Sequence, residues 1–214
     1  MAHNNKKSEL IEVTYELLKV YSPEDITIRM IGSAAGCTST TIYRHFENLD
    51  HLITVASVRL LESYIIEVGG ILNAESSPLD ALRAMWQSFS VQAFKNVETF
   101  EMLFFGRLQK YLNDAIVEYY QMFPSKWWSI NGIFTTVFFS NSVEERNLII
   151  VRRAAADGYL SVKDAALLSD LQVSMFHGEL LKYRKTYRNP EVAAQGAREF
   201  MEMYDYLIDA VRLK

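Results

Sequence analysis

Residues 26–46 read ITIRMIGSAAGCTSTTIYRHF and contain no acidic side chain. Thr27 is a residue type that caps helix N-termini, and Ile31 and Ala35 follow it at helical spacing. Gly36 supplies the permissive backbone conformation that ends such a helix. The first half of the segment therefore predicts a short amphipathic helix followed by a tight turn.

A second short helix is expected after this turn. Thr38 or Ser39 can accept hydrogen bonds from the free amides at its start. Ile42 and Phe46 lie four residues apart and face inward. The outward face then carries hydroxyl, aromatic and basic side chains: Ser39, Thr40, Tyr43, Arg44 and His45. Hydroxyls suit DNA phosphates, an aromatic ring suits a thymine methyl group, and a guanidinium suits guanine or phosphate. The pattern predicts a helix-turn-helix whose second helix enters the major groove of DNA.

The segment resembles the helix-turn-helix of the TetR family of one-component bacterial repressors. The resemblance covers residues 1–50 and rests on Thr27, Arg29, Ile31, Ala35, Gly36, Thr41, Ile42, Tyr43, His45 and Phe46, followed by Asn48 and Leu52. It implies that Arg29 reaches a base from the first motif helix and that the outward side chains of the second helix meet bases or phosphates. The DNA-binding residues predicted in this way are Thr27, Arg29, Ser39, Thr40, Thr41, Tyr43, Arg44 and His45.

Two positions depart from the family pattern. Leu49 stands where the family usually has a lysine that binds backbone phosphate, and Thr40 stands where it often has glycine. The first departure, together with the acidic residues of the first helix, leaves a second interpretation open. In that interpretation the head of a TetR-like dimer binds a partner protein instead of DNA. We expect no enzyme, because the sequence contains no catalytic constellation.

Composition limits the class of protein further. The net charge of −4 over 214 residues argues against a general nucleic-acid binder, so affinity for DNA must come from local charge. The single cysteine excludes an internal disulfide framework and fits a reducing cytoplasm, and no signal peptide precedes the first helix. The longest uncharged run, residues 127–143, holds too many polar residues for a membrane span. The histidines lack metal-ligand spacing, so we expect neither a metal nor another cofactor.

The hydrophobic pattern predicts an all-α protein with a three-helix head, residues 1–50, on a helical ligand-binding and dimerisation body, residues 51–214. A first helix over 6–21 carries an apolar stripe of Leu10, Val13, Leu17 and Val20. Further helices are expected over 49–71, 78–96 and 97–112. Capping residues predict four more helix starts, at Asn113, Ser142, Ser161 and Asn189.

The two closing helices are the best candidates for a homodimer interface. Their small and apolar residues recur at alternating spacings of three and four, which suits a four-helix bundle between two subunits. The predicted interface residues are Leu167, Leu171, Ser174, Gly178, Leu181, Phe200, Met203 and Leu207. The alternative is that both stripes face only their own domain. A reader of palindromic DNA needs a two-fold partner, which favours the interface.

Aromatic residues concentrate between the head and these closing helices. Most of them must form core, but apolar walls with a few polar groups also describe a small-molecule pocket, and TetR-like bodies usually enclose one. The predicted pocket residues are Phe89, Phe105, Arg107, Trp127, Asn131 and Phe134. The function expected is therefore a ligand-responsive transcriptional regulator, a homodimeric repressor that is released from a palindromic operator by an apolar or aromatic effector.

Overall fold

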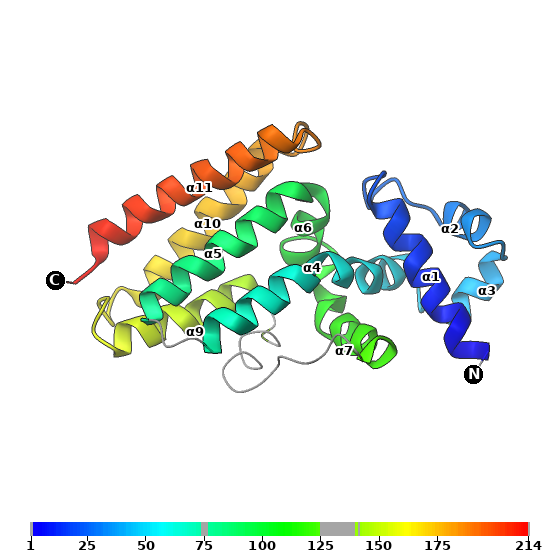
Figure 1. Ribbon diagram of the computed structural model, residues 1–214, viewed down its shortest axis with the longest axis horizontal. Helices are drawn as coiled ribbons and strands as arrows, with labels where there is room; N and C mark the ends of the chain where they lie inside the picture. Colours follow the sequence, from blue (N-terminus) through cyan, green and yellow to red (C-terminus); the bar gives the residue numbers. More distant parts are fainter. Residues whose placement is uncertain (1, 74–76, 125–139, 141, 214) are drawn as a thin grey trace.

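A computed structural model describes residues 2–73, 77–124, 140 and 142–213 of the chain. Within these ranges all regular structure is helical (Figure 1). The helices are α1 (Ala2–Leu18), α2 (Ile28–Ala34), α3 (Ser39–Tyr43), α4 (Leu49–Asn73), α5 (Pro78–Lys95), α6 (Val97–Phe104), the 3₁₀ turn η1 (Gln109–Tyr111), α7 (Leu112–Met122), α9 (Val143–Ala156), α10 (Ala165–Lys182) and α11 (Pro190–Val211).

The helix-turn-helix forms at the predicted positions. The Thr27 hydroxyl accepts a hydrogen bond from the Met30 amide at 3.2 Å, and the Thr38 hydroxyl accepts one from the Thr41 amide at 3.3 Å. Gly36, with φ of +58°, lies in the left-handed region that favours glycine. The predicted caps of α2 and α3 and the glycine that ends α2 are thus confirmed.

Gly32 is a second glycine that this turn requires. A Cβ atom at Gly32 would lie 2.8 Å from the carbonyl oxygen of Cys37, and the Cys37 amide donates to the Gly32 carbonyl at 2.9 Å. The backbone after α2 therefore returns across Gly32 at a distance that no other residue permits. This contact sets the angle between α2 and α3.

The first helix begins and ends earlier than its pattern predicts. It spans Ala2–Leu18, and Val20 lies beyond it with 59% of its surface exposed. The side chains that α1 buries are Leu10, Ile11, Thr14 and Leu18, while Val13 and Leu17 pack at the edge of the core. The predicted stripe is therefore wrong at Val20. Of its other residues, Leu10 lies in the buried face of α1, and Val13 and Leu17 lie at the edge of that face.

Three other predictions of helix bounds are wrong. The helix expected over 97–112 ends at Phe104, because the chain turns at Gly106 and continues as η1. α7 then begins at Leu112, so Asn113 lies inside the helix and does not cap it. The helix expected to start at Ser161 begins at Ala165 after Asp164, which makes no side-chain capping bond. The caps at Ser142 and Asn189 form as predicted, and Ser77 caps α5.

The helix α4 runs from the head into the body, which places α1–α3 at one end of the molecule (Figure 1). It packs on α1 at its start and on α7 and α5 further along. In the body, α5 lies between α11 on one side and α4 and α9 on the other, and α10 packs on both α9 and α11. Within the described residues, no helix combines the length and apolar character that crossing a membrane requires.

We expect Gly32→Ala to destabilise the head, because its methyl group would meet backbone atoms that cannot move without opening the turn. Overpacking of this kind costs about 1–3 kcal/mol. Gly70→Ala is the matched control, because a Cβ atom there meets nothing within 4 Å and alanine favours a helix by about 0.5–1 kcal/mol. Urea unfolding of both variants tests the contact, and equal stability of the two would contradict it.

Candidate nucleic-acid interface and ligand cavity

The outward face of the helix-turn-helix is a row of exposed polar side chains. Ser39, Thr40, Tyr43 and Arg44 are exposed on α3 or at its end, and Tyr43 leaves 55% of its surface in solvent. Arg29 is exposed on α2. Ile42 and Phe46 point the other way and are buried. The arrangement leaves one side of α3 free to approach a flat or grooved partner.

Two of the remaining predicted contact residues, Thr27 and Thr41, have partners within the head. The Thr27 hydroxyl caps α2, and the Thr41 hydroxyl lies 3.1 Å from that of Thr38. Thr41 and His45 are also half-buried. Among the described residues, Arg29 and Arg44 make no ion pair. These two guanidinium groups are therefore the free positive charges of the motif.

Leu49, the departure from the family pattern, opens α4 and packs partly buried against the core. Lysines nearby are already engaged: Lys6 donates to the Ala35 carbonyl at 2.9 Å, and Lys7 pairs with Glu118 of α7 at 2.8 Å. Neither of these two lysines is free to replace the phosphate contact of the lysine for which Leu49 stands. Phosphate contact at the start of α4 would have to come from elsewhere.

A polar junction joins the head to the body. Glu118 of α7 pairs with Lys7 of α1 at 2.8 Å and with the His51 ring of α4 at 2.9 Å. Burial raises the pKa of the Glu118 carboxyl, but the bonds from His51 and Lys7 outweigh it and hold that pKa below its ordinary value. The Asn48 amide donates to the Tyr111 hydroxyl at 3.0 Å. The carboxylate thus stays ionised at neutral pH and links three helices.

Further ion pairs join the head to other parts of the body. Arg107, which we predicted in the pocket, lies on the surface and pairs with Asp50 at 3.1 Å. Arg184, just beyond α10, pairs with Glu24 at 2.9 Å, and Arg188 donates to the Val20 carbonyl at 2.6 Å. Arg107 therefore belongs to the junction between head and body.

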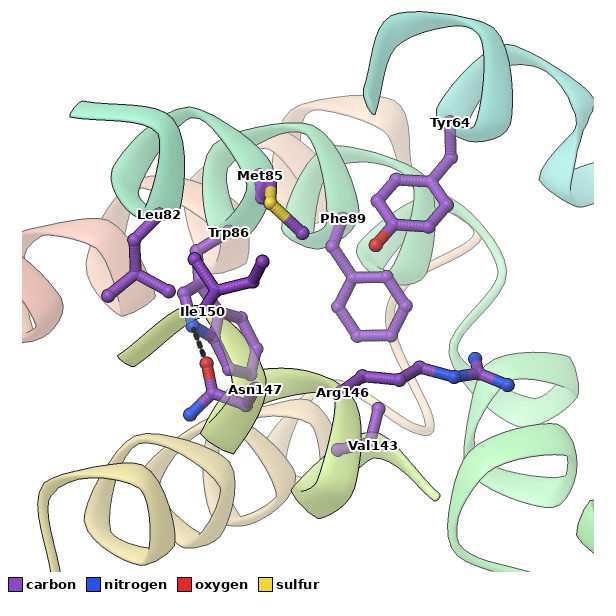
Figure 2. Close-up of a pocket in the computed structure, with 9 residues that line it drawn as sticks. All are labelled: Tyr64, Leu82, Met85, Trp86, Phe89, Val143, Arg146, Asn147 and Ile150. Carbon is purple, nitrogen blue, oxygen red and sulfur yellow. Dashed lines mark hydrogen bonds between the residues drawn. The ribbon is translucent and has the colours of Figure 1, made fainter. Parts of the chain in front are cut away.

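A cavity lies in the body between α4, α5 and α9 (Figure 2). Its walls are Tyr64 from α4, four side chains from one face of α5 and four from one face of α9: Leu82, Met85, Trp86 and Phe89, then Val143, Arg146, Asn147 and Ile150. The cavity volume, measured as the space open to the centres of water-sized molecules, is about 40 Å³. Pockets for drug-sized ligands span ~300–1,000 Å³, so a ligand would have to push these walls apart.

The predicted pocket residues divide into three groups. Phe89 lines the cavity. Phe105 does not, because its ring is stacked on His177 with the two centroids 4.0 Å apart. Trp127, Asn131 and Phe134 lie outside the described residues, so their part in a pocket stays a prediction.

Sequence reasoning missed the polar residues of this cavity. Asn147 is buried and fully engaged: its oxygen accepts from the Trp86 indole at 2.9 Å, and its amide donates to Gln172 at 2.8 Å. Arg146 and Tyr64 remain as polar wall residues. A signal was present, because Val143, Asn147 and Ile150 recur at helical spacing on α9 with polar residues in the middle of the stripe.

An exposed apolar face covers α10 and the adjoining side of α11. Leu167 and Leu171 expose 61% and 47% of their surfaces, and Tyr206 exposes 80%. Ser174, Gly178 and Leu181 are exposed on the same face of α10, and Met203 and Leu207 line a shallow groove beside Leu171 and Tyr206. Exposed apolar patches of this kind mark interaction surfaces.

Phe200, which we predicted in the dimer interface, lies in the core of its own subunit. It has no exposed surface and packs on Trp86 and Phe176, with ring centroids 5.3 and 5.1 Å away. Gly196, one turn earlier, faces Phe94, whose ring would lie 2.4 Å from a Cβ atom there. Around Gly196 and Phe200, the apolar stripe of α11 therefore packs into the core of its own subunit. The prediction that Phe200 lies in the dimer interface is wrong.

A helix-turn-helix head continued by a long helix into an all-helical body is the fold of TetR-family transcription regulators. Solved structures of that family match the chain over nearly its whole length. A TetR transcription regulator from Haloarcula marismortui is 16% identical with a TM-score of 0.61, and the match covers 98% of this chain and 99% of that one.

Two further neighbours have the same fold. SmeT, the repressor of the Stenotrophomonas maltophilia multidrug efflux pump SmeDEF, is 12% identical with a TM-score of 0.56, over 97% of this chain and 91% of its own. Thermus thermophilus FadR, solved in complex with lauroyl-CoA, is 12% identical with a TM-score of 0.55, over 92% of both chains. No family model and no curated protein matches the sequence. At these identities the likeness establishes the fold.

We expect Phe89→Ala to lower the free energy of unfolding by about 3–5 kcal/mol, because Phe89 is buried among aromatic rings. Phe105→Ala should cost less, because Phe105 is only partly buried. Denaturant titration of both variants measures the difference. A Phe89→Ala cost no larger than that of Phe105→Ala would show that the cavity is not set in a packed aromatic core.

Proposed function

We propose that the chain is a ligand-responsive, DNA-binding transcriptional regulator that acts as a homodimeric repressor. The observation that carries this proposal is the exposed row on α3, with Arg44 and Tyr43 at its end, on a fold that matches TetR-family regulators. Residues 1–50 would form the DNA-binding domain and residues 51–214 the ligand-binding and dimerisation domain.

The chemistry of the row suits a major groove. Ser39 and Thr40 offer hydroxyls to phosphates, the Tyr43 ring can contact a thymine methyl group, and the Arg44 guanidinium can bind guanine or phosphate. Residues 26–46 hold two arginines and no acidic residue, although the whole chain carries a net charge of −4. Non-specific affinity should therefore be modest and should fall with salt.

Dimerisation would follow from the exposed face of α10 and α11. Leu171, Met203 and Leu207 could pack against the same residues of a second copy, since a two-fold interface places one patch on itself. The dimer would set two α3 helices in successive major grooves, about 34–36 Å apart. Such a pair reads a palindromic operator in double-stranded DNA.

The effector would act through α4. The cavity is too small for a typical ligand as it stands, so an apolar or aromatic molecule must displace wall residues to enter. One of those residues, Tyr64, belongs to α4, whose first turns pack against the head. A tenfold loss of operator affinity needs only about 1.4 kcal/mol of differential ligand binding between the two states.

Arg44→Ala or Tyr43→Ala should weaken binding to the preferred duplex by about 1–3 kcal/mol per half-site and leave the fold intact, because both side chains face solvent. Fluorescence anisotropy with a labelled duplex, together with circular dichroism, measures both effects. Arg152→Ala, an exposed arginine of α9, is the control and should bind as wild type. Unchanged affinity in both α3 variants would favour a head that binds a partner protein.

Gly178→Arg should yield monomers, because it inserts a long charged side chain into the apolar face of α10. The position is exposed and a Cβ atom there meets nothing within 4 Å, so the subunit itself should stay folded. Ala194→Arg, on the side of α11 opposite Met203, should remain dimeric. Sedimentation velocity distinguishes the two. A dimeric Gly178→Arg variant would place the interface elsewhere.

A further inference from the structure

We propose that the cavity binds an apolar monocarboxylate, whose anionic group is held by the Arg146 guanidinium and the Tyr64 hydroxyl and whose apolar part packs on α5. The inference rests on the proposed function, because it names the chemical class of the effector that the same cavity would take.

Among the described residues, no ion pair neutralises the charge of Arg146. Its Nε lies 3.3 Å and its Nη2 3.1 Å from the Ser140 carbonyl oxygen, and Nη2 lies 3.4 Å from the Asn113 side-chain oxygen. The Phe104 ring centroid is 5.6 Å from the guanidinium. All of these partners are uncharged, and the attraction of Glu145, the preceding residue on α9, is weaker than the desolvation of the guanidinium. No carboxylate among the described residues forms an ion pair with Arg146, and the chain outside them has one acidic side chain, Glu75.

An unpaired guanidinium in this position is costly. Desolvation lowers the pKa of Arg146 from its ordinary value, which means that the surroundings disfavour the charged form. A group that is desolvated and unpaired lowers stability, and proteins tolerate such groups where function needs them. A bound anion would offset the free energy lost by desolvating the guanidinium. A carboxylate fits a guanidinium through two parallel hydrogen bonds.

Tyr64 supplies a second donor on the opposite wall. Its hydroxyl points inward beside Phe89, and the Arg146 side chain runs below Phe89 in the same view (Figure 2). Burial raises the pKa of Tyr64 to about 12, so the hydroxyl keeps its proton at neutral pH. Among the described residues this hydroxyl makes no hydrogen bond. It is therefore available to donate to an anion.

The rest of the cavity selects for an apolar body. Leu82, Met85, Trp86 and Phe89 present one continuous apolar face of α5, and Ile150 faces them from α9. The Asn147 amide adds no free polar group, since it is bonded to Trp86, Ser169 and Gln172. One positive charge on an otherwise apolar wall matches a single anionic group on an apolar molecule.

Matched pairs of probes test the assignment: 2-naphthoate against 2-naphthalenemethanol, and octanoate against 1-octanol. Isothermal titration calorimetry on the full chain should show each acid binding at least about tenfold more tightly than its alcohol, a difference of ~1.4 kcal/mol. Arg146→Gln should abolish this preference, and Tyr64→Phe should reduce it. Arg152→Gln, which removes an exposed charge from the same helix, should retain it.

A second measurement requires no ligand. Arg146→Met replaces the desolvated charge with an apolar side chain of similar length, so its thermal unfolding midpoint should equal or exceed that of the wild type. A midpoint several degrees lower would assign Arg146 a structural role and overturn the proposal, as would an acid preference that persists in Arg146→Gln.

The outcomes separate this inference from the function on which it rests. Acids and alcohols that bind equally well to the wild type would refute the anion site and leave an apolar effector cavity standing. A chain that binds none of the four probes would refute both the anion site and the ligand-responsive cavity. DNA binding by α3 is measured independently and is unaffected by either result.

Discussion

The second and third turns of α4 are buried on every side, and the arrangement of head and body depends on this burial. The seven consecutive residues Leu52–Val58 have no exposed surface. A helix buried all round cannot present polar groups to water, and its two polar residues are satisfied locally. The Thr54 hydroxyl donates to the Asp50 carbonyl at 2.6 Å, and the Ser57 hydroxyl donates to the Ile53 carbonyl at 2.7 Å. The segment is thereby enclosed by α1 and α7 without an unpaired polar group.

This enclosure makes α4 the path by which the body could act on the head. The polar junction of Lys7, His51 and Glu118 surrounds the same turns, so a shift of α4 alters contacts with α1 and α7 together. Tyr64 lies less than two turns beyond Val58 and lines the cavity. A displacement of a few tenths of an ångström at Tyr64 would have to be accommodated by packed side chains, which transmit strain instead of absorbing it.

Local chemistry could be predicted from the sequence in the helix-turn-helix, although the caps expected at Asn113 and Ser161 do not form, and long-range contacts could not be predicted. The caps at Thr27 and Thr38 and the left-handed Gly36 depend on a few neighbouring residues, so their sequence pattern predicts them correctly. The cavity depends on how α5 and α9 cross, which no local pattern encodes, and Arg146 and Tyr64 were missed for that reason.

Exposure was equally hard to predict. Helical spacing placed Phe200 and Leu171 in one interface, although Phe200 is buried in its own subunit and Leu171 is exposed. Val20 matched an apolar stripe but lies beyond the end of α1. Spacing identifies residues that share a face; the tertiary packing decides whether that face meets the core or solvent.

Selection of bound sequences from random duplex DNA at low salt is the most direct test of the central claim that this chain is a dimeric reader of DNA. The account predicts enrichment of a palindrome whose half-sites are centred about one helical turn apart, ~10–10.5 base pairs, or a multiple of that spacing. Binding to it should weaken steeply as salt is raised. Recovery of no enriched sequence, or of a sequence without two-fold symmetry, would contradict the claim.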